Sequence, residues 1–321
     1  MNKLALTAVL AWAVVAGGVF AAGDHKADES ANERPKIPPT VRPPEDQKIV
    51  KYRPATPKQI EANHKLAKQW AEKVRQDIAP KMHLVETEHF LIFSEWALDD
   101  DKSLADVCEK MYAAMCRQFG IPAKQNIWAG KCPIYLFRNI GHFRRFTTEV
   151  DQADRPEAAG YQRQYSNGFC YIVINAVRNK IQFYGILVHE ATHAFLGRYL
   201  TNRPVSTWVN EGLAEYMAAM QVPGSWASQR HIYAARVAAK GRADVMRIFQ
   251  DMEPTELDYG LAQSLVRFMI ARDRKAFVKF VKLIKEGESE AEALKKSYRT
   301  THAGLARAWT QAVERMYKLR R

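Results

Sequence analysis

The chain reads KIQFYGILVHEATHAFLG from Lys180 to Gly197. No proline interrupts this run, and between its end residues the only charged side chain apart from histidine is that of Glu190. A helix that is apolar on every side belongs in a protein core, so the segment predicts a buried helix over 180–197. Two histidines and a glutamate in such a helix cost free energy unless they are satisfied. A bound metal ion satisfies them.

The pentapeptide HEATH within this run has the spacing of a zinc site. His189 and His193 are four residues apart, so they share one face of a helix and can bind one Zn²⁺ through their imidazoles. Glu190 is placed to hold the metal-bound water and to take its proton. One class of zinc proteases adds a glycine and a third histidine just downstream. Leu196 and Tyr199 occupy those positions here, which excludes that class.

The next segment offers acidic residues as the third ligand. It reads WVNEGLAEY over residues 208–216, and its apolar spacing predicts a second amphipathic helix over 208–220. Glu211 and Glu215 are four residues apart and therefore share a face of that helix. One of them can bind the metal while the other accepts the outer N–H of a ligand histidine. The spacing alone leaves both assignments open.

Together the HEATH and WVNEGLAEY segments resemble the gluzincin metallopeptidases, of the thermolysin and aminopeptidase N type. The second segment is similar to the W-x-N-E-G-x-A-x-Y signature of the aminopeptidase N-like members. The resemblance implies a zinc ion held by His189, His193 and Glu211, with Glu215 behind the ligands. It also implies hydrolysis of a peptide or protein substrate by a zinc-bound water that Glu190 assists. The glycine motif of aminopeptidase N exopeptidases (G-A-M-E-N-like) is absent, so the resemblance does not extend to aminopeptidase activity.

The same resemblance indicates where the rest of the site lies. In gluzincins a Tyr or His beyond the third ligand stabilises the oxyanion; Tyr259 is the best candidate, and Tyr216 and His231 are its rivals. The substrate backbone lies along an edge strand, which points to the segment 169–174. The resemblance to a largely uncharacterised group of exported bacterial peptidase MA-like proteins spans most of residues 83–315. Its outer matches are ETEHFLIFS from residue 86 and YGLAQSLV from residue 259.

The N-terminal residues predict an exported protein. Residues 1–22 have the positive start, the apolar run and the small-residue cleavage site of a secretory signal, with cleavage near Ala21 in a periplasmic or extracellular protein. Residues 23–56 are polar and rich in proline, which predicts a disordered tether. Residues 57–82 predict an N-terminal helix, and residues 57–80 could cover the cleft.

The pattern of residues 83–321 predicts an α+β fold. Strands alternate with helices as far as the zinc helix, which predicts a small mixed-sheet lobe over 83–198. The remainder reads as nearly all helix, which predicts a helical lobe over 199–321. The resemblance makes this a thermolysin-like catalytic core with a cleft between the lobes. The predicted strands are 83–94, 131–138 and 168–175, and the predicted helices are 102–119, 140–150, 180–197, 208–220, 226–240, 243–250, 259–271, 275–286, 289–297 and 303–318.

If the chain is exported, its four cysteines can form disulfides, because disulfides persist in oxidising compartments. Cys108 and Cys116 lie on one predicted helix, about 12 Å apart at the helical rise per residue, which is beyond disulfide reach. Pairings between that helix and the strands, or a single Cys132–Cys170 bond between strands, remain open.

The chain of 321 residues carries a formal net charge of +13. Its basic residues are spread out, and aromatic residues are not interleaved with them as in nucleic-acid binders. We therefore expect no nucleic-acid partner. The charge is interpreted first as a solvated basic surface, and the alternative is an electrostatic attraction to anionic polymers or lipid head groups of the cell envelope. A catalytically silent zinc domain that binds envelope polymer or peptide is the alternative to a peptidase. An accidental HEATH in a structural envelope protein is the third interpretation. Oligomeric state stays open.

Overall fold

The structure, a computed structural model, describes residues 49–152, 158–165, 167–175, 177, 179–250 and 254–318. The predicted signal segment over 1–22 and most of the predicted tether lie outside the described residues. Within the described part of the chain, every helix is too short or too polar to cross a membrane.

The last residues of the predicted tether, 49–56, are not the free chain that the sequence predicts. Lys51 forms an antiparallel bridge with Thr201. The backbone N–H of Tyr52 donates to the carbonyl oxygen of Leu200 at 2.8 Å. This part of the chain is therefore attached to the segment that follows the predicted zinc helix.

The sheet consists of β1 (His83–Glu86), β2 (Phe90–Ser94), β3 (Cys132–Leu136), β4 (Gly160–Gln164) and β5 (Cys170–Ile174). Its order is β1-β2-β3-β5-β4. The three central strands run parallel to one another, and both edge strands run antiparallel to their neighbours. The chain is thus a mixed α/β protein with a small mixed sheet, as the sequence predicts at this coarser level.

The single strand predicted over 83–94 is wrong, because the segment folds into two antiparallel strands. Thr87 closes the turn between them: its N–H donates to the carbonyl of Phe90 at 3.0 Å, and its hydroxyl accepts from the N–H of Phe90 at 3.1 Å. The strand β4 is not predicted at all. Only Tyr161 of its five residues is buried, so it lacks the apolar pattern that marks a strand.

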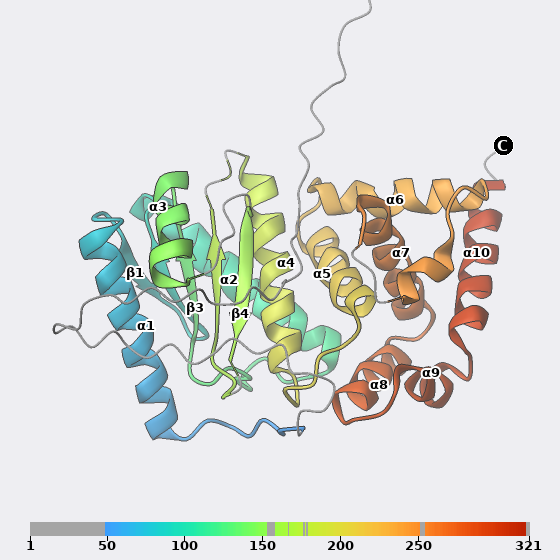
Figure 1. Cartoon of the computed structure of the whole chain (residues 1–321), viewed down its shortest axis with the longest axis horizontal. Helices are drawn as coiled ribbons and strands as arrows, with labels where there is room; N and C mark the ends of the chain where they lie inside the picture. The colour runs from blue at the N-terminus through green and yellow to red at the C-terminus, as the bar shows by residue number, and fades with distance from the viewer. Residues whose placement is uncertain are drawn as a thin grey trace, which may run out of the picture.

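Helices cover both faces of the sheet (Figure 1). One face carries α1 (Pro57–Asp77) and α3 (Ile140–Arg145), and the other carries α2 (Leu98–Phe119) and α4 (Lys180–Arg198). Strand alternation makes the division: Phe93 packs toward α1 and Ile92 toward α4. On the α1 side, Trp70 meets the ring of Tyr171 edge-on at 5.3 Å between centroids. Contrary to the expectation for residues 57–82, α1 therefore lies on the face opposite α4.

The described part of the chain after α4 is helical, and its α5 (Thr207–Gln221) and α6 (Trp226–Ala239) pack against α4 (Figure 1). The helix α7 (Glu256–Arg272) lies along both α5 and α6. The segment predicted as a helix over 243–250 forms a short 3₁₀-helix, and the one predicted over 140–150 is α3 continued by the π-helix η1 (Phe146–Val150). The helical elements are α5 (Thr207–Gln221), α6 (Trp226–Ala239), η2 (Val245–Phe249), α7 (Glu256–Arg272), α8 (Arg274–Lys285), α9 (Glu290–Tyr298) and α10 (His302–Lys318).

A buried lysine holds the C-terminal end of α4. Lys285 is 1% exposed, and its ammonium donates to the carbonyls of Gly197 at 3.2 Å and Arg203 at 2.7 Å. A helix end leaves its last carbonyls without partners inside the helix, so Lys285 supplies one such partner. Burial, assisted by the charge of Arg198, lowers the pKa of Lys285 to about 7.

The lowered pKa predicts that stability depends on pH through Lys285. An unfolded chain keeps this proton up to a pKa of 10.5, whereas the folded protein releases it near 7. Between these values the unfolded state binds more protons, so the free energy of unfolding rises with pH. The rise approaches about 1.4 kcal/mol per pH unit. Urea unfolding of the wild-type protein and of Lys285→Met from about pH 6 to about pH 9 measures it. A difference between the two proteins that does not vary with pH would contradict the prediction.

All four cysteines are buried free thiols, so the expected disulfide is absent among them. Cys132 and Cys170 lie on neighbouring strands with their Sγ atoms 3.9 Å apart. Cys108 and Cys116 both lie on α2. Burial raises the pKa of Cys108, which keeps its thiol protonated and unreactive.

Candidate metal centre

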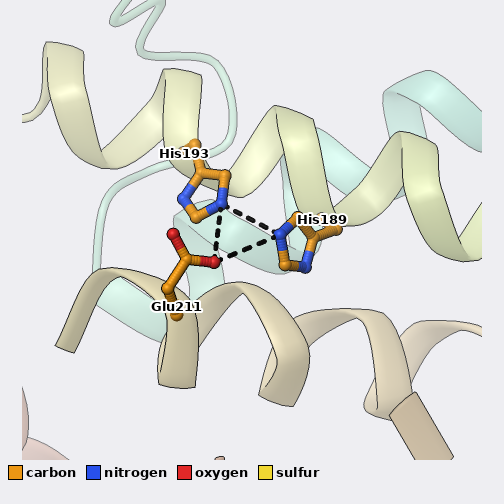
Figure 2. Close-up of side chains that lie close together, drawn as sticks. All are labelled: His189, His193 and Glu211. Carbon is orange, nitrogen blue, oxygen red and sulfur yellow. Dashed lines mark hydrogen bonds and ion pairs between the residues drawn. The ribbon is translucent and has the colours of Figure 1, made fainter. Parts of the chain in front are cut away.

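Helices α4 and α5 bring His189, His193 and Glu211 together (Figure 2). The Nε2 atoms of the two histidines lie 3.0 Å apart. Glu211 Oε2 lies 3.4 Å from His189 Nε2 and 3.3 Å from His193 Nε2. The three residues predicted as metal ligands thus converge on one point from two adjacent helices.

The spacing of these three atoms suits a metal ion. Ligand atoms about 2 Å from a tetrahedral ion lie about 3.3 Å from one another, close to the observed 3.0, 3.3 and 3.4 Å. Glu211 Oε2 is buried, and the imidazole nitrogens at 3.3 and 3.4 Å are too far away for strong hydrogen bonds, which is costly for a carboxylate oxygen. A cation between the three atoms removes that cost. The residues therefore fit a divalent ion, and their nitrogen and oxygen donors are of the kinds that zinc binds.

The charges of the site are coupled. Burial alone would lower the pKa of His193, but the charge of Glu211 and a hydrogen bond with it, followed by the charge of Glu190 and a hydrogen bond with Asn210, raise it to about 9. Burial would likewise raise the pKa of Glu211, but the two imidazoles hold it well below its usual range. Protons and metal cations therefore compete for the same atoms of this site.

The glycine of the WVNEGLAEY segment allows α5 to approach α7 closely. A Cβ on Gly212 would lie 2.6 Å from the carbonyl oxygen of Ala262 and 2.8 Å from Val266 Cγ2. At the start of α5, the indole N–H of Trp208 donates to Glu290 at 2.8 Å. These contacts fix the helix and so set the adjacent Glu211 against α4.

We expect Gly212→Ala to displace α5 and to weaken the metal site. The obstacle is the backbone oxygen of Ala262, which cannot rotate aside, so overpacking should lower the free energy of unfolding by about 1–3 kcal/mol. Gly141→Ala in α3 is the matched control, since its Cβ would meet only the side chain of Asn139, at 3.1 Å. Urea unfolding and metal titration measure both effects. Equal behaviour of the two variants would argue against the close contact between α5 and α7.

Glu215 lies behind the ligands and is 1% exposed. Its Oε1 is 3.5 Å from His189 Nδ1, and it accepts hydrogen bonds from Trp226 Nε1 at 3.3 Å and Arg230 Nη1 at 2.7 Å. A carboxylate in this place orients a ligand imidazole and raises its basicity. The structure thus places Glu211 among the converging atoms and Glu215 behind them. Trp226 and Arg230 were not predicted, because no spacing on α6 links them to the HEATH segment.

Glu190 is half-buried on α4, beside the edge strand β4. A Cβ on Gly160 would lie 3.3 Å from Glu190 Cγ. The expectation that the segment 169–174 provides the edge strand is wrong, because β5 lies between β3 and β4. The edge strand beside Glu190 is β4. The sequence pattern did not predict this strand.

Among the described strands, none pairs with the side of β4 that faces away from β5, and this outer side is called the open side of β4. The N–H of Tyr165 donates to the carbonyl of Phe169 at 2.8 Å, and the groups that face a partner alternate along an antiparallel ladder. The N–H and carbonyl groups of Gly160, Gln162 and Gln164 therefore face away from β5. An extended peptide can add to such an edge as a further strand.

Tyr259 shares a hollow with Glu211, between α5, η2 and α7. Tyr259 as a whole residue is 6% exposed. Burial, and then the charge of Glu211, raise the pKa of Tyr259. The rival residues Tyr216 and His231 do not line this hollow.

A second close group consists of Glu88, His89 and Glu109. The backbone N–H of His89 and its Nδ1 both bond to Glu109, at 2.9 and 2.6 Å. The imidazole also stacks on Tyr112, with 3.9 Å between ring centroids. These contacts give His89 and Glu109 a structural role that needs no metal ion.

Comparison of the chain with known protein families and with curated proteins finds no match. What the structure shows is a small mixed sheet joined to a helical region, with a His-His-Glu group on α4 and α5 in which both histidines are buried and Glu211 is half-buried. The chemistry of that group is the ground for assigning a function.

Proposed function

We propose that this protein is a zinc-dependent peptidase of the gluzincin type, with a thermolysin-like catalytic core. The observation that carries the proposal is the 3.0–3.4 Å triangle of donor atoms from His189, His193 and Glu211, with Glu190 beside them on α4. Three protein ligands leave the fourth position of a zinc ion open, which is typical of catalytic and not of structural zinc.

In this proposal, a zinc ion held by the three residues supplies the Lewis acidity that polarises a carbonyl and acidifies water. Glu190 holds the attacking water, takes its proton and passes it to the leaving nitrogen. The open side of β4 binds the peptide as an added strand, which holds the scissile bond beside Glu190. The hydroxyl of Tyr259 donates a hydrogen bond to the developing oxyanion. Its raised pKa keeps that proton in place.

Export and attraction to the envelope form a further part of the proposal. The composition of residues 1–22 supports a signal peptide that is removed near Ala21, which would deliver the domain to the periplasm or the exterior. The net charge of +13 supports attraction to anionic envelope polymers at that location.

Metal analysis and a protease assay test the proposed activity. We expect about one zinc ion per purified chain. We also expect hydrolysis of an unfolded protein substrate that a chelator stops and added zinc restores. Stoichiometric zinc without hydrolysis would favour the catalytically silent alternative. A protein that binds no zinc would overturn the proposal.

A further inference from the structure

One arginine on α6 connects the candidate metal centre with Tyr259. Arg230 Nη1 donates to Glu215 Oε1 at 2.7 Å, and its Nη2 lies 2.8 Å from Glu256 Oε2. Its Cζ lies 5.5 Å from the ring centroid of Tyr259. Glu256 and Tyr259 are one helical turn apart on α7, and Glu215 is on α5. A single guanidinium therefore bridges these two helices.

The backbone of α6 fixes Arg230 in this position. A Cβ on Gly260 would lie 2.8 Å from the carbonyl oxygen of Arg230 and 3.1 Å from its Cγ, so α6 and α7 touch at this point. At the start of α6, the N–H of Trp226 donates to the side chain of Gln182 on α4 at 3.1 Å. The side chain of Arg230 is 19% exposed. Its guanidinium is thus held in place by the same helices that carry the site.

The charges around the site explain why a cationic side chain is favourable next to Glu215. Glu190, Glu211 and Glu215 bring three carboxylates to one region, so a divalent cation alone would leave negative charge there, and Arg230 offsets part of it. Glu215 is the most buried of the three, and a buried carboxylate is costly unless a cation or several donors satisfy it. Arg230 bonds to Oε1, the same oxygen that lies 3.5 Å from His189 Nδ1. The arginine therefore acts on the oxygen that faces the ligand histidine.

We propose that Arg230 is a positioning residue that couples the metal ligand His189 to Tyr259. Through Glu215 it orients the imidazole of His189, and through its planar face it holds the ring of Tyr259. This inference rests on the proposed function, since it concerns the same site. It adds a residue that lies outside both the ligand set and the HEATH and WVNEGLAEY segments.

The first test measures metal binding and needs no substrate. Cobalt(II) is titrated into wild-type protein, Arg230→Gln and, as the matched control, Arg236→Gln, an exposed arginine of the same helix. The visible absorption of bound cobalt reports the ligand geometry. We expect Arg230→Gln to bind about 10- to 100-fold more weakly and to change the spectrum, while Arg236→Gln matches the wild type. Wild-type affinity and spectrum in Arg230→Gln would overturn the inference.

Arg230→Lys separates the two contacts. Lysine keeps a positive charge for Glu215 but lacks the planar face that packs on Tyr259. We expect it to restore metal affinity while kcat stays low and KM hardly changes. Full recovery of kcat would overturn the link to Tyr259, and failure to recover metal affinity would overturn the link through Glu215.

Glu256→Gln is a second test of the inference that does not depend on the Arg230 variants being folded. The side chain of Glu256 is 59% exposed and holds the outer end of the guanidinium, so its replacement should leave the protein folded. We expect weaker metal binding in the same direction, and unchanged binding would count against the inference. A wild-type protein that binds cobalt but hydrolyses nothing refutes the proposed function alone. A wild-type protein that binds no metal refutes both.

Discussion

We expect Glu190→Gln to abolish the proposed hydrolysis while leaving the proposed metal binding intact. A positioned general base contributes about 10²- to 10⁴-fold to a rate, and an amide cannot take the proton of the attacking water. Metal binding survives because Glu190 is not one of the three converging ligands. Its charge also raises the pKa of His193, so its removal reduces the competition of protons for that imidazole.

The measurement pairs turnover of an unfolded protein substrate with the zinc content of the same preparation. Wild-type protein treated with a chelator serves as the control that loses activity through metal loss. If Glu190→Gln retains turnover, Glu190 is not the base. If it loses zinc, Glu190 takes part in holding the metal.

Glu211→Ala will weaken metal binding more than Glu215→Ala. Glu211 Oε2 lies within 3.4 Å of both ligand nitrogens, so its removal takes away one of three donor atoms. Glu215 acts from behind His189, and loss of such a partner typically costs about 10- to 100-fold in affinity. Competition titrations against a chelator measure both variants under the same conditions. The reverse order would exchange the two roles.

The two helices of the candidate site could be predicted to within a residue or two. The apolar run around HEATH and the spacing of WVNEGLAEY are local properties, and local patterns determine where helices begin and end. The predicted zinc helix over 180–197 is α4 (Lys180–Arg198), and that over 208–220 is α5 (Thr207–Gln221). The family resemblance and the peptidase activity stay predictions.

Features that depend on contacts between distant segments could not be predicted. The place of β5 inside the sheet follows from its pairing with β4, a strand with a single buried side chain. Arg230 lies in the site because α6 touches α7 at Gly260. The periodicity of apolar residues along the sequence does not reveal that contact between helices. The turn at Thr87 depends on its hydroxyl and backbone bonds to Phe90, which the apolar pattern of 83–94 conceals.

The open side of β4 also affects how the protein behaves at high concentration. A strand edge with unpaired backbone groups accepts any extended chain, including the same strand of another molecule, and so favours aggregation. β4 has only five residues, and glutamine and arginine side chains make up most of it. Short, polar edges resist such pairing between copies. The polarity that hides β4 from sequence patterns is thus the property that keeps an accessible edge compatible with solubility.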